Sequence, residues 1–159
     1  MNDVQQTARS ALKEVREMVT QMRGTRVEDE IFRVTQILKA AEIEYRIVGD
    51  PILKNTSLLS ENVLSMCLKE AVTNIVKHSE ATTCTITIES TRTNLVIKVK
   101  DNGIGMDKDN NRLRGNGLRG MMERLGFVNG SLEIISNDGT LLTISVPNVV
   151  KNQEKEMEL

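Results

Sequence analysis

The sequence predicts an α/β two-layer sandwich, with helices on one face of a mixed, mostly antiparallel sheet and an additional helix at the N-terminus. The 159 residues are enough for one hydrophobic core with a short appendage. Segments with helical spacing of apolar residues are outnumbered by segments in which apolar and polar residues alternate. Several predicted strands are joined by tight turns rather than by crossover helices. These observations favour a layered sheet over a doubly wound parallel sheet.

Residues 4–22 have the spacing of a helix that needs a partner. Small or apolar residues recur there in a heptad pattern, at Val4, Ala8, Ala11, Val15, Met18 and Met22. Such a seam is typical of a helix that pairs with another helix. The alternative is an ordinary amphipathic helix that packs on its own domain, and the sequence favours neither.

The first elements of the main domain are two helices with a strand between them. Residues 28–41 predict a helix with acidic residues in its first turn, where the helix dipole favours them. Residues 42–48 alternate and predict a strand. Residues 58–78 predict the longest helix, and either Ser57 or Ser60 is placed to cap it.

The second half of the chain predicts two hairpins separated by a loop and a short helix. The strands are expected at residues 82–90, 95–99, 131–136 and 140–146. Residues 101–117 are rich in Gly, Asp and Asn and predict a long loop, a feature that is often functional. Residues 118–125 predict a short helix. Asn137-Asp138-Gly139 is a strong hairpin turn, and residues 149–159 predict a flexible tail.

Composition excludes several classes of function. The net charge of -1 gives no general attraction to nucleic acid or anionic membranes, and one Tyr, two Phe and no Trp leave few platforms for base stacking. No apolar run is long enough to span a membrane, and the N-terminus has no signal-peptide pattern. Cys67 and Cys84 lie in apolar patterns, so we expect two buried, reduced thiols in a cytoplasmic protein.

The long helix carries the first candidate site. Glu70, Asn74 and His78 are four residues apart, and Lys77 lies beside them. Residues at this spacing stack along one helix face. A carboxylate, an amide oxygen and basic groups in a row suit Mg²⁺ and phosphate. Taken alone, the pattern fits a solvated helix face equally well.

The long loop and the last hairpin carry three further motifs. Asp101 follows a strand and precedes Gly103 and Gly105, so a carboxylate able to accept an amino hydrogen bond lies beside backbone that a flat ligand can approach. Gly115-Asn116-Gly117-Leu118 opens a helix, whose free N–H groups can bind phosphate. Gly139-Thr140 precedes the last strand. Each of these is weak by itself, because ordinary turns look the same.

The order and context of the four motifs resemble the N box, the two glycine boxes and the final Gly-Thr of the GHKL ATPase superfamily. This superfamily includes DNA gyrase, Hsp90, histidine kinases and MutL, and the resemblance covers about residues 58–147. It implies the Bergerat-type ATP-binding fold. The Glu-Ala-x-x-Asn-x-x-Lys-His form of the N box and the short segment between Gly105 and Gly115 resemble the NarX/DesK-like subgroup of bacterial sensor histidine kinases.

The resemblance implies roles for individual residues. Glu70 and Asn74 would be catalytic, and Asn74 would bind Mg²⁺. Asp101 would accept a hydrogen bond from the adenine amino group. The residues expected to contact ATP are Asn74, Lys77, His78, Asp101, Gly103, Gly105, Gly115, Gly117, Leu118 and Thr140. Catalysis of phosphoryl transfer depends largely on such positioning and charge neutralisation.

The resemblance also implies the organisation of the protein. Residues 1–23 would be the C-terminal part of a dimerisation and phosphotransfer helix, and residues 25–148 the catalytic domain that binds ATP and Mg²⁺. The γ-phosphate would pass to a histidine on a dimerisation helix that this chain does not contain. The expected partners are that dimerisation domain, a second subunit and a response regulator, but no nucleic acid. The expected location is the cytoplasmic part of a membrane-bound sensor.

Two positions depart from the pattern. Relatives often have His where this chain has Asn116, which puts a phosphate contact there in doubt. The charged motif with the phosphate-accepting histidine is absent, and the only histidine is His78 in the N box. We therefore expect a chain that binds ATP and Mg²⁺ without phosphorylating itself. The alternative is an anti-sigma factor type of serine kinase with the same fold, which would not need the heptad helix.

Overall fold

The computed structural model describes residues 9–13, 26–105 and 116–148. Most of the heptad segment, residues 106–115 with Gly115, and the C-terminal tail lie outside the described residues. The predictions for a dimerisation helix, for the second glycine box at Gly115 and for a flexible tail therefore stay predictions.

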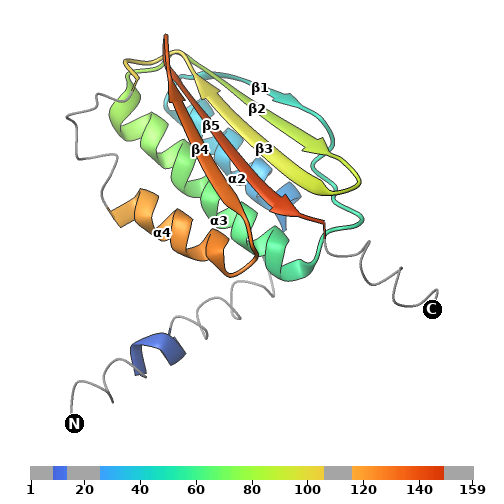
Figure 1. Cartoon of the computed structure of the whole chain (residues 1–159). Coiled ribbons are helices and arrows are strands. Elements are labelled where there is room, and N and C mark those ends of the chain that lie inside the picture. The colour runs from blue at the N-terminus through green and yellow to red at the C-terminus, as the bar shows by residue number, and fades with distance from the viewer. Residues whose placement is uncertain (1–8, 14–25, 106–115, 149–159) are drawn as a thin grey trace, which may run out of the picture.

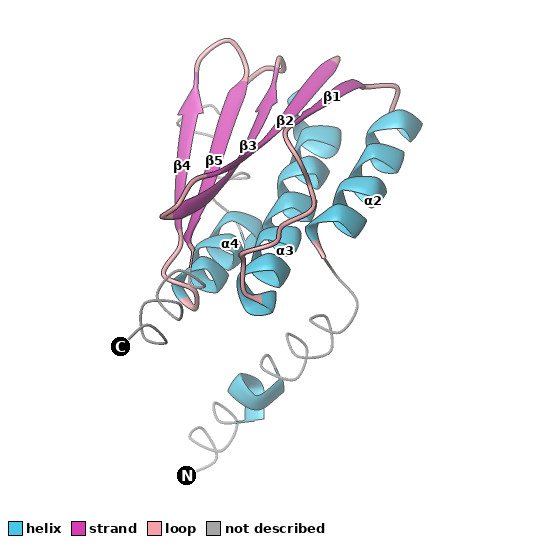
Figure 2. Cartoon of the chain, turned by 90° about the vertical axis from the view of Figure 1, so that its right-hand side faces the viewer, coloured by secondary structure: helices cyan, strands magenta, loops and turns pink. Residues whose placement is uncertain are grey.

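The described main domain consists of two layers (Figures 1 and 2). Three helices cover one face of a five-stranded sheet whose strand order is β1-β2-β3-β5-β4. The helices are α2 (Val27–Ala40), α3 (Leu58–Asn74) and α4 (Asn116–Gly126). The strands are β1 (Glu44–Val48), β2 (Thr83–Ser90), β3 (Asn94–Asp101), β4 (Ser131–Ser136) and β5 (Thr140–Pro147). This arrangement confirms the predicted α/β sandwich.

The sheet is mixed and mostly antiparallel, as the tight turns between strands predicted. β1 and β2 are parallel, and every other neighbouring pair is antiparallel. The β4–β5 hairpin turns at Asn137-Asp138-Gly139, as expected. β3 continues beyond the predicted end at Val99 to Asp101, because it pairs along its whole length with β5. The ladder between β3 and β5 therefore carries Asp101 to a position opposite Thr140.

Strand alternation places the core between the two layers. In β2, β3 and β5 every second residue is buried against the helices, for example Ile86, Ile97 and Ile144, each 0% exposed. The helices contribute aliphatic residues of the same kind, such as Leu38 and Leu68. Burying aliphatic side chains provides most of the stabilisation of such a core, at about 25 cal/mol per Å² of apolar surface.

The long helix differs from the prediction at its C-terminal end. The sequence predicts regular winding to His78, but α3 ends at Asn74 and continues as the π-helix η1 (Ile75–Ser79). The Ser79 hydroxyl donates to the Ile75 carbonyl at 2.7 Å and accepts from the Ala81 N–H at 3.1 Å. A π-helical turn takes more residues than an α-helical turn and is frequent at functional sites. The simple four-residue stacking expected from Glu70 to His78 therefore does not hold beyond Asn74.

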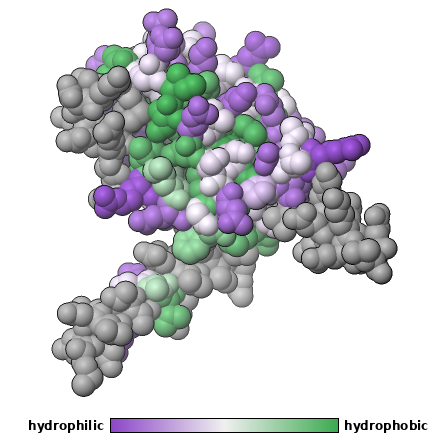
Figure 3. All heavy atoms as spheres, viewed as in Figure 1, coloured by the Kyte–Doolittle hydropathy of each residue, from purple (hydrophilic) through white to green (hydrophobic). Residues whose placement is uncertain are grey.

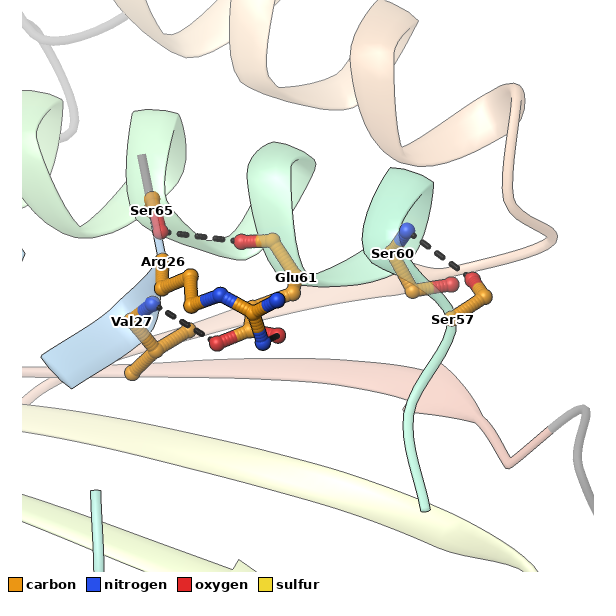
Figure 4. A network of polar contacts seen from close by, with 6 residues as sticks. All are labelled: Arg26, Val27, Ser57, Ser60, Glu61 and Ser65. Atoms are coloured by element: carbon orange, nitrogen blue, oxygen red, sulfur yellow. Dashed lines mark hydrogen bonds and ion pairs between the residues drawn. The ribbon is translucent and has the colours of Figure 1, made fainter. Parts of the chain in front are cut away.

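The N-termini of α2 and α3 are joined by a polar network (Figure 4). Ser57 caps α3 by accepting from the Ser60 N–H at 3.1 Å, which decides between the two predicted caps. The buried Glu61 carboxylate accepts from the Val27 N–H at 3.0 Å and lies 3.9 Å from the Arg26 guanidinium. The first turn of α3 thus holds the first turn of α2.

Candidate functional site

A pocket opens between the C-terminal end of the long helix, α4 and the strands β3, β4 and β5. Six of the predicted site residues line it: Asn74, His78, Asp101, Gly105, Leu118 and Thr140. They come from four segments that are distant in the sequence. On the side of the molecule where α4 and β4 lie, Figure 3 shows a hydrophobic area, and the apolar Met122 and Ile135 are 58% and 49% exposed.

Asp101 is the buried acid of this pocket. It ends β3, is only 5% exposed and lies between Cys84 of β2 and Thr140 of β5 in the ladder. Its Oδ1 accepts from the Gly103 N–H at 2.8 Å. Burial raises the pKa of the Asp101 carboxyl, while hydrogen bonds from the Gly103 and Thr140 backbone act in the opposite direction. A buried carboxylate can accept a hydrogen bond from an N–H group of a ligand.

The glycines beside Asp101 allow the loops of the site to pack closely. A Cβ at Gly103 would collide with the backbone carbonyl of Ser79, at the end of η1. Gly139 has φ +111, and a Cβ there would collide with the backbone carbonyl of Asp101. Both glycines are thus required by contacts within the protein, in addition to any contact with a ligand.

The opposite end of the site lies where α3 approaches the start of α4. The Glu70 side chain is half-buried, and a Cβ at Gly117 would collide with its carboxylate. Glu70 and Gly117 are therefore brought together, although neither lines the pocket itself. Lys77 is exposed and also lies outside the pocket lining.

Sequence reasoning missed the apolar wall of the pocket. This wall consists of Ala71, Ile75, Val99, Met121, Ile134 and Leu142. Their spacing is that of ordinary core residues, and no local signal distinguishes a core position from a pocket wall. It also missed Ser79, which holds the loop after Asp101 by accepting from the Ile104 N–H at 2.8 Å.

The donor groups of the site fit a magnesium ion held mainly by a phosphorylated ligand. Within residues 9–13, 26–105 and 116–148, no cluster of three or more His, Cys, Asp or Glu side chains could hold a metal by itself. The Asn74 amide lines the pocket and offers one oxygen of the hard kind that Mg²⁺ prefers. Mg²⁺ usually keeps several waters and takes other ligands from substrate phosphates.

Both cysteines are buried free thiols, which confirms the prediction that they are reduced core residues. Burial raises the pKa of Cys67 and of Cys84 to about 12. A thiol of such high pKa is rarely ionised and is a poor nucleophile. We therefore exclude both from the chemistry of the site.

The chain belongs to the family of histidine kinase-, DNA gyrase B- and HSP90-like ATPases, whose family model matches residues 60–150, more than half of the chain. This confirms the superfamily predicted from the four motifs. Two sensor histidine kinases of Bacillus subtilis (strain 168) are similar to it. It is 49% identical to DesK over 93% of this chain and 38% identical to YvfT over 94% of this chain. The chain spans 40% of the length of each of these relatives.

Solved structures share the fold. The histidine kinase domain of the Erythrobacter litoralis EL346 blue-light activated kinase matches with a TM-score of 0.64 at 16% identity, covering 75% of this chain and 59% of the other. The Acinetobacter baumannii histidine kinase AdeS matches with a TM-score of 0.60 at 15% identity, covering 87% of this chain and 79% of the other. At these identities the likeness supports the fold. None of the described helices is long and apolar enough to cross a membrane.

Proposed function

We propose that this chain is the ATP-binding catalytic part of a sensor histidine kinase, and that it donates the γ-phosphate of ATP to a histidine on a dimerisation helix outside this chain. The observation that carries the proposal is one pocket that contains the buried Asp101 carboxylate and the Asn74 amide. The similarity to DesK and YvfT favours this proposal over the anti-sigma factor type of kinase.

The adenine base would bind at the strand end of the pocket. The Asp101 carboxylate would accept a hydrogen bond from the exocyclic amino group, with Thr140 beside it. The apolar side chains of Met121, Ile134 and Leu142 line the same pocket and would cover the faces of the base. Apolar walls with a few placed polar groups are typical of sites for small ligands.

The phosphates would lie between the long helix and the start of α4. Asn74 would hold Mg²⁺, which neutralises charge on the phosphates when it is bound. The free N–H groups at the start of α4, including those of Gly117 and Leu118, favour anionic oxygens because of the helix dipole. Lys77 and His78 would add positive charge, and Glu70 would orient groups around the γ-phosphate.

The complete protein would act as a dimer. We place residues 1–23 at the end of the dimerisation helix and residues 25–148 in the catalytic domain. The partner that receives the phosphate after the histidine would be a response regulator. The chain would lie on the cytoplasmic side of a membrane-bound sensor.

Titration calorimetry of the purified chain with ATP tests the proposal. We expect ATP to bind in the presence of Mg²⁺, with weaker binding after chelation of the metal. Asn74→Ala should lose most of the magnesium dependence, whereas Asn94→Ala, at the distant start of β3, should retain it. Absence of ATP binding to the wild-type chain at millimolar nucleotide would refute the proposed function.

Incubation with γ-labelled ATP tests the prediction that the chain lacks its phosphate acceptor. We expect no acid-labile label on the chain alone, because its only histidine, His78, lines the nucleotide pocket. Acid-labile label on His78 would contradict this prediction.

A further inference from the structure

We propose that Asn102 is a positioning residue that holds Asp101 inside the pocket and thereby sets a preference for adenine over guanine nucleotides. This inference rests on the proposed ATP-binding function. Asn102 follows Asp101 directly and lies outside the lining of the pocket. Its side chain is exposed to solvent and takes no part in the hydrophobic core.

The Asn102 side chain makes three hydrogen bonds to the start of β2. Its Oδ1 accepts from the backbone N–H groups of Thr82 and Thr83, each at 2.9 Å. Its Nδ2 donates to the Thr82 hydroxyl at 2.8 Å. One side chain therefore closes the end of the β2–β3 ladder, immediately beyond Asp101. We refer to this group of Asn102, Thr82 and Thr83 as the Asn102 clamp.

The position of Asp101 makes such a clamp necessary. Asp101 is the last residue of β3, and strand ends fray readily unless something holds them. Its buried carboxylate is also desolvated, which favours a movement of the strand end toward water. The Asn102 clamp fixes the backbone on the C-terminal side of Asp101, while the pairing with Cys84 and Thr140 fixes Asp101 in the sheet.

The residues that follow Asn102 are also held by hydrogen bonds. The Gly103 N–H donates to the Asp101 carboxylate at 2.8 Å, and the Ile104 N–H donates to the Ser79 carbonyl at 2.8 Å. The first of these hydrogen bonds spans Asn102. A displaced Asn102 would therefore move the donor that orients the Asp101 carboxylate.

The orientation of this carboxylate is what distinguishes the two purines. Adenine carries an amino donor at C6, and guanine carries a carbonyl acceptor at the same ring position. A carboxylate accepts from the former and repels the latter. A site built to pair with a polar group discriminates strongly only while its own group is held in place. A freed Asp101 would bind ATP less tightly and reject GTP less effectively.

The test compares the wild-type chain with Asn102→Ala, Asn102→Asp and Thr82→Val by calorimetric titration with ATP and with GTP. Asn102→Ala loses all three bonds, and we expect ATP affinity to fall about tenfold, with a much smaller change for GTP. Asn102→Asp keeps the acceptor for both backbone N–H groups and should recover most of the preference. Thr82→Val loses one bond and should cost roughly twofold to threefold.

Asn94→Ala is the matched control. Asn94 is also an exposed asparagine, and its side-chain Nδ2 donates to the Thr93 hydroxyl at 3.4 Å, but it lies at the opposite end of β3. We expect its nucleotide preference to equal that of the wild type. If Asn102→Ala kept the wild-type ratio of ATP to GTP affinity, or changed it no more than Asn94→Ala does, the inference would be wrong.

A second readout does not need nucleotide. The Asp101 carboxyl can be titrated by NMR in the free protein, where its pKa should be raised by burial. In Asn102→Ala the pKa should move toward the ordinary value because the carboxylate reaches water, and in Asn94→Ala it should stay raised. An unchanged pKa in Asn102→Ala would overturn the inference even if the chain bound no nucleotide, whereas failure of wild-type ATP binding would overturn the proposed function.

Discussion

Burial of the Asp101 carboxylate lowers the stability of the folded protein at neutral pH. Its carboxylate is almost completely buried, and its pKa is raised because burial disfavours the charged form. The native state then binds the proton more tightly than the unfolded chain does. The stability linked to this group is full below the ordinary aspartate pKa and is lost as pH rises through the raised native pKa. A neutral side chain of the same shape would remove this loss.

Asp101→Asn should therefore stabilise the protein while it abolishes ATP binding. The amide keeps an oxygen for the Gly103 N–H, and we expect a gain of about 1 kcal/mol at neutral pH that shrinks as pH falls. Urea unfolding at a series of pH values, from below the ordinary aspartate pKa to neutral pH, measures this. Asp50→Asn is the control, because exposed Asp50 makes the equivalent bond to the Ile52 N–H at 2.9 Å. A loss of stability in Asp101→Asn at neutral pH would contradict the account.

Gly117 and Glu70 form a second pair whose roles depend on each other. Gly117→Ala places a methyl group against the Glu70 carboxylate, the end of a flexible and half-buried side chain, which must turn away. We therefore expect it to lose about 0.5 kcal/mol of the stabilisation that alanine normally gives in a helix. In a Glu70→Ala background the same substitution should cost much less, because the space is then free. Urea unfolding of the four variants gives the coupling energy.

Gly120→Ala supplies the control within the same helix. The nearest atom to a Cβ at Gly120 is the Arg124 guanidinium nitrogen at 3.8 Å, so the substitution meets no obstacle. We expect it to stabilise α4 by up to about 1 kcal/mol, because alanine favours helix. If Gly117→Ala had the same effect in the wild type as in the Glu70→Ala background, the Glu70 side chain would not restrict this position.

At the scale of elements, the start of α2 depends on another helix. Its N-cap residue Arg26 provides no side-chain hydrogen bond, and the buried Glu61 of α3 accepts from the Val27 N–H instead. A first-turn N–H without an acceptor is costly when it is buried. The contact links the element that follows residues 1–25 to the helix that carries Asn74.

Glu61→Ala should cost about 1–3 kcal/mol of stability, because the Val27 N–H loses its acceptor in a buried position. Glu61→Gln keeps one oxygen and should cost less. Glu28→Ala is the control, since Glu28 is an exposed acid in the first turn of α2 and contributes only through the helix dipole. Equal denaturation midpoints for Glu61→Ala and Glu28→Ala would show that the buried contact does not stabilise α2.

The elements were more predictable than their junctions. Period-two and helical spacing predicted the strands β1 to β5 and the helices α2, α3 and α4, because these elements pack against a single core. The π-helix η1 was not predictable from local spacing, since it depends on Ser79 and on the loop that packs against it. The Val27–Glu61 bond joins residues 34 positions apart, and nothing in either local sequence identifies it.

At the scale of the whole molecule, the site is a product of strand order. Asp101 and Thr140 are far apart in the chain, but they face each other because β5 lies between β3 and β4. The helices α3 and α4 lie on one side of this sheet (Figure 1). Asn74 of α3 and Leu118 of α4 therefore line one pocket. The four motifs located the polar groups of this pocket in the sequence, whereas the apolar wall required the tertiary packing.

A crystal structure of the chain with Mg²⁺ and a non-hydrolysable ATP analogue would show directly whether ATP binds beside Asp101. We expect the adenine amino group to lie within hydrogen-bonding distance of the Asp101 carboxylate, with the metal between the Asn74 amide and the phosphates. An adenine bound elsewhere, or a base in the pocket with its amino group turned away from Asp101, would contradict it.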